Sequence, residues 1–431
     1  MITHTREAVV ARRAAWLVLY RGASDVTAKG VMLVITVAAA RRLTREEFAL
    51  FALASTLGWL GSVAADFGIQ VHLAREVSQR PHLAADLLRR WLPVRVATGA
   101  AALALAATTV PALGLGRDAL LPILLFTVAY AATGMSECLY YFFRGLERTD
   151  LESTFTLAQR AIMAGLAIGV LWLRPDITLL AGAMLLPAVL TLGLTAATAR
   201  RLAAGRDQGR RVIAMPRGDE FLHSVAPIGL GILLSALYFR VDLFLLERWS
   251  GETAVALYNA VFRLVDALRL FPAAVLAVTL PGLCRASDRR PVTRLAARLT
   301  AAATGAAVVL WLAAAWLVPA IYGEPYRDAV APFRTLVAAL PLMALNYALT
   351  HQLIGWHGQR AYAGICAGAL GCNLFLNWHL IPALGMSGAA WATLWTEFVL
   401  TAGCVIALSR TDPARPVFPA GAANIGIGVR S

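Results

Sequence analysis

The sequence predicts an all-α polytopic membrane protein with about twelve transmembrane helices. Its 431 residues are 59% apolar and only 15% charged, whereas soluble domains carry about 25% charged residues. The mean hydropathy is +0.66, and apolar stretches of about 20 residues, long enough to cross a bilayer as a helix, recur along the chain. Arginine-rich polar segments separate these stretches, as expected for the loops that orient membrane helices.

The predicted spans follow one another with short connections, except at one place. They are 17–40, 48–73, 92–113, 119–143, 154–173, 177–199, 222–247, 254–280, 299–321, 330–354, 361–383 and 386–409. The longest polar connection, 200–220, divides them into six and six. We therefore expect an N-terminal six-helix bundle over 1–199, a cytoplasmic linker at 200–220 and a C-terminal bundle over 221–410. The tail at 411–431 is rich in Pro and Gly and is predicted to be disordered.

The two groups of six spans resemble each other weakly. Residues 45–51 (REEFALF) open the second span, and residues 252–258 (ETAVALY) open the eighth. The polar end of the fourth span, 144–148 (RGLER), has a counterpart after the tenth, 356–360 (WHGQR). An even number of spans per half predicts parallel repeats related by an axis along the membrane normal. Transporters built from such repeats bind substrate between the halves, so we expect two pseudo-symmetric bundles around a central site.

The distribution of basic residues predicts that both termini are cytoplasmic. With that orientation, twenty-three basic residues lie in cytoplasmic segments and seven in outer segments, and an excess of Arg and Lys marks the cytoplasmic side. The outer seven are Arg41, Arg42, Arg45, Arg117, Arg174, Arg248 and Arg327. The net charge of +14 therefore reflects topology, and we expect no nucleic-acid partner. Residues 1–15 lack a signal-peptide pattern, so the first span is expected to direct insertion.

Enzyme signatures are missing from the sequence. The single lysine, Lys29, is followed by Gly30 and Val31, which excludes a G-x-x-x-x-G-K-[ST] loop and argues against ATP hydrolysis. No HExxH, GxSxG or DxD pattern occurs. The five cysteines have no CxxC spacing and suit small apolar positions in a core. We expect neither an enzyme nor a metal site.

Fifteen ionisable residues lie inside the predicted spans. They are Arg21, Asp25, Lys29, Asp66, Arg95, Glu137, Arg160, Arg240, Asp242, Arg263, Asp266, Arg269, Arg298, Arg334 and Glu397. Left unpaired in lipid, each would cost about 3 kcal/mol, so they must pair, reach the membrane surface or line water. Arg95, Arg298 and Arg334 lie near predicted span ends and can extend to the surface. Nine of the fifteen are basic, so the interior carries a net positive charge.

Six of these charges form two rows, one in each half. The rows are Arg21, Asp25 and Lys29 in the first span, and Arg263, Asp266 and Arg269 in the eighth. Their spacings, i, i+4, i+8 and i, i+3, i+6, place each row on one face of a helix. In each row a single Asp lies between two cations. We expect the first-span row and the eighth-span row to face each other across a hydrated cleft that attracts an anion, since arginine binds phosphate oxygens bidentately.

The candidate functional residues follow from this interpretation. The substrate-binding candidates are Arg21, Lys29, Arg240, Arg263 and Arg269. The carboxylates that can exchange a coupling proton or Na⁺ are Asp25, Asp66, Glu137, Asp242, Asp266 and Glu397. No catalytic residue and no cofactor beyond such a coupling H⁺ or Na⁺ is expected. An alternative reading is that some of these charges only hold helices together as ion pairs.

Several short motifs resemble those of a transporter family. They are 40–52 (ARRLTREEFALFA), 65–68 (ADFG) with Arg75 and Glu76 after it, 142–148 (FFRGLER), 238–246 (YFRVDLFLL) and 256–260 (ALYNA). Together they resemble the polysaccharide-transport (oligosaccharide flippase) branch of the multidrug/oligosaccharidyl-lipid/polysaccharide exporter superfamily. The first is similar to the family's Leu-Gly-Pro-acidic-acidic-Phe-Gly turn, with Thr44 and Arg45 in place of the usual Gly and Pro.

This resemblance implies a MATE-like, V-shaped pair of six-helix bundles that opens alternately to the two sides of a bacterial inner membrane. The implied cargo is an undecaprenyl-pyrophosphate-linked oligosaccharide, with its pyrophosphate on the cations of the cleft and its tail in the lipid. Counter-transport of H⁺ or Na⁺ would reset the cycle. The implied partners are membrane lipids, glycosyltransferases and a polysaccharide polymerase.

Two other functions remain open from the sequence alone. A cation-coupled drug or metabolite antiporter of the same fold would export organic cations, for which a net positive cleft is a poor host. An interaction or glycan-processing membrane protein without flipping activity is the third possibility, although the short outer loops leave little room for a processing site.

Overall fold

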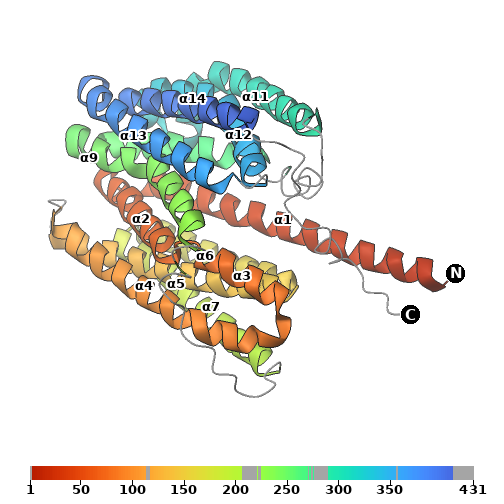
Figure 1. Ribbon diagram of the computed structural model, residues 1–431. Helices are drawn as coiled ribbons and strands as arrows, with labels where there is room; N and C mark the ends of the chain where they lie inside the picture. The colour runs from red at the N-terminus through yellow and green to blue at the C-terminus, as the bar shows by residue number, and fades with distance from the viewer. Residues whose placement is uncertain are drawn as a thin grey trace.

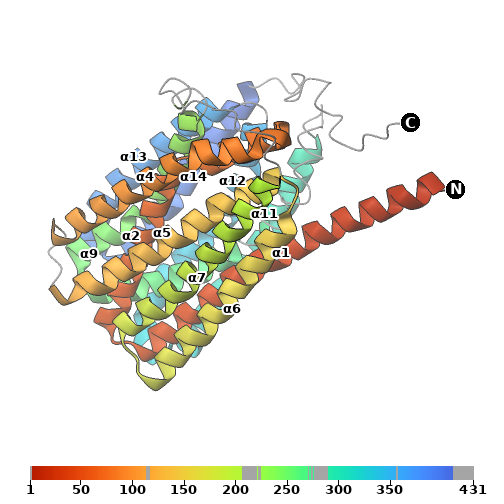
Figure 2. The same cartoon turned by 90° about the horizontal axis from the view of Figure 1, so that it is seen from below.

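The computed structural model has the all-α architecture that the sequence predicts. It describes residues 2–112, 117–205, 221, 225–269, 271, 272, 275, 290–355 and 358–410, and these contain helices and no strand. The predicted linker beyond residue 205, the predicted tail at 411–431 and the last residues of the predicted eighth span lie outside the described residues. Figure 1 shows α1 between the other N-terminal helices and the C-terminal helices, and Figure 2 shows its N-terminal end projecting beyond them.

Long helices make up both halves of the chain. In the N-terminal half they are α1 (Ile2–Arg42), α2 (Arg45–Asp66), α3 (Ile69–Gln79), α4 (Ala84–Ala112), α5 (Arg117–Gly145), α6 (Thr149–Leu173) and α7 (Ile177–Ala204), with a 3₁₀ turn η1 at Pro81–Leu83. In the C-terminal half they are α9 (Ala226–Leu268), α11 (Arg290–Tyr322), α12 (Val330–Gly355), α13 (Gln359–Leu384) and α14 (Met386–Arg410), with a 3₁₀ helix η3 at Glu324–Ala329.

Eleven helical segments of the described chain are long and apolar enough to cross a membrane. One of them, Gly229–Leu268, has 40 residues, and a straight helix of that length would measure about 60 Å, about twice the hydrocarbon thickness of a bilayer. It is not straight, because Gly251 has φ 75° and ψ 179°, outside the helical region. Glycine adopts this backbone conformation without the steric cost that a Cβ would impose.

Side-chain contacts show that α9 folds back on itself at Gly251. The hydroxyl of Tyr258 donates a 2.6 Å hydrogen bond to Asp242 Oδ2. The rings of Phe239 and Phe262 have centroids 5.0 Å apart. Both pairs are centred close to residue 251, so the two arms of α9 run antiparallel and side by side. The eleven segments therefore provide twelve crossings, which agrees with the predicted number.

The predicted second span is interrupted. The sequence predicts one helix over 48–73, but α2 ends at Asp66 and α3 begins at Ile69, because Phe67 and Gly68 have φ values of 41° and 84°. The Asp66 carboxylate accepts hydrogen bonds from the backbone N–H groups of Gly68 and Gln70, both at 3.1 Å. These bonds satisfy donors at the start of α3. Asp66 thus stabilises a helix start that hydropathy does not reveal.

The turn between α1 and α2 contains a capping box. Thr44 Oγ1 accepts from the backbone N–H of Glu47 at 3.2 Å, and the Glu47 carboxylate accepts from the backbone N–H of Thr44 at 3.0 Å. This reciprocal pair satisfies two otherwise free donors and starts a helix sharply. The second helix therefore begins three residues earlier than predicted, at Arg45.

Helices pack mainly within their own half, and one apolar core joins the halves. In the N-terminal half α5 packs against α7 and α2, and α1 against α6; in the C-terminal half α13 packs against α9 and α14, and α12 against α11 and α14. The halves meet where α2 and α1 contact α9. A single buried cluster includes Phe51 and Phe126 of the N-terminal half together with Phe262 and Phe333 of the C-terminal half.

Candidate functional site

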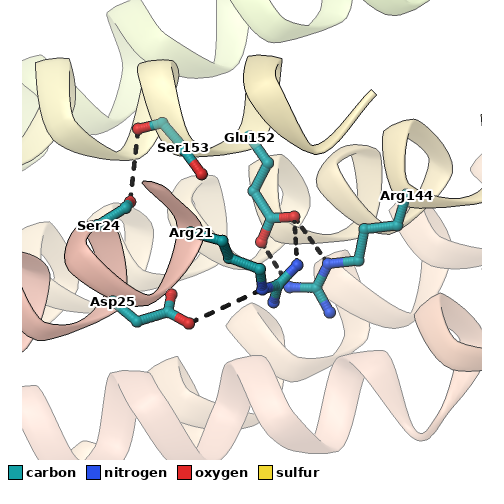
Figure 3. A network of polar contacts seen from close by, with 6 residues as sticks. All are labelled: Arg21, Ser24, Asp25, Arg144, Glu152 and Ser153. Atoms are coloured by element: carbon teal, nitrogen blue, oxygen red, sulfur yellow. Dashed lines mark hydrogen bonds and ion pairs between the residues drawn. The ribbon is translucent and has the colours of Figure 1, made fainter. Parts of the chain in front are cut away.

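The first-span row lies beside a carboxylate of α6. Arg21 Nη1 is 2.9 Å from Glu152 Oε2, and Arg144, at the end of α5, donates to the same carboxylate through Nε at 2.8 Å. Figure 3 shows the two guanidinium groups converging on Glu152, with Ser24 of α1 reaching the backbone carbonyl of Ser153. Only 8% of the Glu152 side chain is exposed. Glu152 therefore holds α1, α5 and α6 together at this end.

The other two members of the row remain accessible. Asp25 Oδ2 lies 3.9 Å from Arg21 Nε, and 57% of the Asp25 side chain is exposed. Lys29 is exposed as well. With Arg144 and Glu152 included, the group has three cations and two carboxylates, so one positive charge is not balanced locally. Accessible ionised groups on an apolar helix are expected to face water inside the protein and not lipid.

The eighth-span row lies on the second arm of α9, and all three members are half-buried. Arg269 Nη1 is 3.8 Å from Asp266 Oδ1, and its guanidinium lies 4.2 Å from the centre of the Phe239 ring. Arg263 Nε is buried and has no hydrogen-bond partner in the part of the chain that the structure describes. Two cations share one carboxylate here, so this row too carries a surplus positive charge and an unused donor.

Arg240 lies in the first arm of α9, between aromatic rings. Its guanidinium is 4.5 Å from the Phe262 ring centre and 5.6 Å from that of Phe239, and the residue is only 3% exposed. The charges of Arg263 and Asp266 act on it. Arg240 is therefore part of the wall behind the eighth-span row, and its cation–π contacts hold the two arms of α9 together.

One charge of each row acts on the same side chain of α12. Tyr347 of α12 lies within electrostatic range of both Arg269 and Asp25. Arg269 also acts on Glu397 of α14. One member of each row is thus brought to the neighbourhood of the same α12 side chain, although residues 25 and 269 are far apart in sequence.

The candidate carboxylates of the C-terminal half take part in two buried polar groups. In the first, Tyr258 connects Asp242 with Thr393, at 2.6 and 3.3 Å. In the second, Asn346 donates to Glu397 Oε2 at 2.7 Å and its own carbonyl oxygen accepts from Thr401 at 2.8 Å.

A small void of about 10 Å³ separates these two polar groups. It is lined by Tyr238, Phe239, Asn373, Thr393, Thr396 and Glu397, and its volume is near the lower limit for a single bound water. No group of three or more His, Cys, Asp or Glu residues that could hold a metal ion occurs among the described residues.

The candidates of the N-terminal half are more dispersed. Asp66 lies 3.9 Å from Arg95 Nε, and Arg95 is only 1% exposed, so the expectation that Arg95 extends to the membrane surface is wrong. The reason is that α4 begins at Ala84, eight residues before the predicted span, which puts Arg95 three turns inside the helix. Glu137 is exposed on α5, within range of the charges of Arg160 and Asp66.

Sequence reasoning missed the acidic partner of the first-span row. Glu152 lies just before the predicted fifth span at 154–173, whereas α6 begins at Thr149 and includes it. The sequence held a usable signal, because Asp150 and Glu152 are the acidic residues favoured in the first turn of a helix. Tyr258 and Asn346 were missed too, since uncharged polar residues in apolar spans carry no distinct pattern.

The far end of α1 makes contacts of a different kind. Arg41 donates to the backbone carbonyls of Ile321 and Ala320 at the end of α11, both at 2.6 Å. Arg45 donates to the carbonyl of Pro325 at 3.2 Å. These contacts, which we call the α1–α11 clamp, join the two halves. Those of Arg41 use free carbonyls at the C-terminus of α11, and that of Arg45, the first residue of α2, uses a carbonyl of η3.

Comparison with known proteins adds a family and a fold. The family model described as "Polysaccharide biosynthesis protein" matches residues 16–287. No match to a curated protein is found. Among solved structures, the chain is similar to lipid II flippase MurJ in an inward closed conformation, with a TM-score of 0.70 and 12% identity, over 91% of this chain and 87% of that one.

Two further similar structures come from multidrug resistance MATE family transporters of the MOP superfamily. The inward-facing one has a TM-score of 0.67 and 16% identity, over 89% of this chain and 94% of that one. The outward-facing one has a TM-score of 0.63 and 16% identity, over 91% and 95%. At these identities the similarity shows the fold, and the fold is that of MATE and MurJ transporters.

Proposed function

Because the chain belongs to the polysaccharide biosynthesis protein family, whose model matches more than half of it, we propose that it is a flippase. Its cargo is an oligosaccharide linked to undecaprenyl pyrophosphate, which it carries across the bacterial cytoplasmic membrane for surface polysaccharide synthesis. The fold shared with lipid II flippase MurJ and with MATE transporters supports a transport function. No catalytic step is part of the proposal.

The observation that carries the proposal is the surplus of cations in both charge rows. Two carboxylates balance three cations around Arg21, and within the eighth-span row one carboxylate balances two cations. Arg263 adds a buried Nε–H without a partner in the described chain. A pyrophosphate supplies the missing acceptors and negative charge, since guanidinium groups bind its oxygens bidentately. Lys29 and Asp25 stay accessible for the arriving cargo.

The α1–α11 clamp supports alternating access as part of the proposal. The clamp joins the halves at the end where α1 meets α2, and the excess of basic residues in the other connections favours an outer position for this end, with both termini in the cytoplasm. A protein closed on the outside receives cargo from the cytoplasm.

The buried carboxylates of the C-terminal half are our candidates for ion coupling. Asp242 and Glu397 are each 2% exposed, and hydroxyl and amide groups supply further oxygen ligands. Binding of H⁺ or Na⁺ there would remove or balance a charge next to the eighth-span row, because Arg269 acts on Glu397. Because the bound ion leaves the site more positive, uptake of the ion would strengthen the binding of the anionic cargo, and loss of the ion would favour its release. Glycosyltransferases and a polymerase would act before and after this step.

The test is a flipping assay with the purified protein in liposomes and a fluorescent sugar linked to undecaprenyl pyrophosphate. We expect Arg263→Gln with Arg269→Gln to reduce the flipping rate at least tenfold without a loss of thermal stability. Arg327→Gln is the matched control, because Arg327 forms an exposed pair with Glu324 far from both rows. Flipping at the normal rate by the double variant would contradict the proposal.

The second candidate is a cation-coupled drug or metabolite antiporter, which the similarity to multidrug MATE transporters favours. Its cargo would be an organic cation, so removing Arg263 and Arg269 should preserve or increase export. A dye-efflux measurement in the same liposomes, with a pH or Na⁺ gradient, separates the two functions. Efflux by the wild type together with no flipping would establish the antiporter.

A further inference from the structure

A large cavity lies at the clamped end of the molecule. Its volume is about 1170 Å³. It is bounded by the last turns of α1, the start of α2, the end of α6, the second arm of α9 and the segment that joins α11 to η3. Leu264, which lies beside Arg263, reaches it, but no charged residue of either row is among the described residues that line it. The cavity is therefore next to the eighth-span row but is not formed by the charges of the proposed cargo site.

The lining of this cavity is divided into an apolar part and a cationic part. Leu33, Val34 and Val37 form an apolar strip along α1, and Arg42 and Arg45 lie at its end. No Asp or Glu is among the described residues that line it. Val34 is 52% exposed, as expected for a wall that is continuous with the lipid-facing side of α1.

The cations at the cavity end are held in place. The Arg42 guanidinium lies 4.4 Å from the ring centre of Trp172, a cation–π contact that leaves its N–H groups at the ring edge free to donate. Arg45 donates one N–H group to the Pro325 carbonyl. The start of α2 lies next to them, and its capping box with Glu47 fixes the position of Arg45.

We propose that this cavity binds the phosphate group of a lipid. Arg42 and Arg45 bind the phosphate oxygens, and the first methylene groups of the lipid chain lie along Val34 and Val37. An apolar strip that ends in two arginines matches the order of groups in such a lipid, and arginine is favoured over lysine where phosphate is bound bidentately. The phosphate competes with the Pro325 carbonyl for Arg45, so its binding weakens the α1–α11 clamp.

Two lipids share this chemistry. One is an anionic phospholipid such as phosphatidylglycerol, which would act on the clamp from the surrounding bilayer. The other is undecaprenyl phosphate, the carrier lipid without its sugar, and this assignment rests on the proposed function. A binding measurement distinguishes them, and because it contains no transport step, its failure leaves the proposed flippase activity untouched.

The experiment is a native mass spectrometry titration of the purified full-length protein with each of the two lipids and with phosphatidylcholine as the zwitterionic control. We expect saturable binding of one phosphate lipid per protein, at least tenfold tighter than phosphatidylcholine. Arg42→Gln with Arg45→Gln should weaken this binding at least tenfold, and Arg327→Gln should leave it unchanged. The lipid that binds with the higher affinity is then assigned to the cavity.

A second variant keeps the arginines and fills the cavity. Val34→Trp should reduce binding of the same lipid by a similar factor, and because Val34 is exposed it should fold normally. Equal affinity of the wild type and both variants for the two phosphate lipids would overturn the proposal. So would phosphatidylcholine binding as tightly as they do, since the cations would then contribute nothing.

Discussion

The two ends of the membrane-crossing part of α1 hold their surroundings by different means. At one end Arg21 pairs with the buried carboxylate of Glu152, which also binds Arg144, so α1 is attached to helices of its own half. At the other end Arg41 binds uncharged backbone carbonyls of α11, so α1 is attached to the opposite half. The first contact joins full charges away from water, and the second joins a charge to dipoles at an exposed position.

This difference indicates which of the two contacts separates at the lower free-energy cost. Separating buried opposite charges leaves unpaired ions and is strongly unfavourable, whereas the exposed Arg41 regains hydrogen bonds to water when it leaves the carbonyls of α11. In a transporter that alternates between two openings, the Glu152 end therefore moves with the N-terminal half as one body. We expect the Arg41 end to be the contact that opens and closes.

The largest effect is expected from Glu152→Gln, which breaks the first contact. It leaves Arg21 and Arg144 half-buried without their carboxylate, and we expect the free energy of unfolding to fall by about 2–3 kcal/mol, at the low end for a buried pair because the arginines are partly exposed. Thermal unfolding in detergent measures this. Asp150→Asn is the matched control, since the Arg148–Asp150 pair is exposed on both sides and should matter much less. If both variants lost the same free energy of unfolding, the buried Glu152 contacts would be no stronger than the exposed Arg148–Asp150 pair, which would contradict this interpretation.

Arg41→Gln breaks the second contact and should act on conformation more than on stability. Loss of two charge-assisted hydrogen bonds, reduced by exposure to water, should favour separation at this end by about 1–2 kcal/mol. Spin labels at Glu46 and Arg327, both exposed and on opposite halves, should report a larger population at long distance. An unchanged distance distribution would show that Arg41 does not hold the halves together.

Tyr326→Phe weakens the contact between the halves at the same end without removing a charge. The Tyr326 hydroxyl donates a 3.0 Å hydrogen bond to the carbonyl of Ala40, across the two halves, while its ring packs against Phe48. Phenylalanine keeps the ring contact, so we expect a shift of about 1 kcal/mol toward separation, smaller than that of Arg41→Gln. The same spin-label pair measures it, and an effect exceeding that of Arg41→Gln would assign the clamp to the tyrosine.

Thr44→Ala should lower stability without opening the molecule. It removes the cap of α2, which lies next to the clamp but inside one half, and a lost cap costs about 1 kcal/mol. We expect a reduced unfolding temperature with the spin-label distances unchanged. Separation of the halves in this variant would mean that the start of α2 and the clamp form a single cooperative unit.

The sequence was a better guide to helices than to side-chain partners. Twelve crossings were predicted and are present, because a run of about 20 apolar residues has few alternatives in a bilayer. The break at Phe67 and Gly68 was missed, since positive φ values leave no mark in hydropathy. The start of α4 was placed eight residues late, which led to the wrong expectation for Arg95 and its pairing with Asp66.

The sequence alone determined that the chain can span the membrane many times, because runs of about 20 apolar residues belong to the sequence and no folding can alter them. Only the tertiary structure decided which charges pair. Arg21 meets Glu152 across 131 positions, and Arg41 meets α11 across 280. Such partners depend on how helices rotate and cross, and the free energies that set those angles come from packing among all helices at once and not from any local pattern.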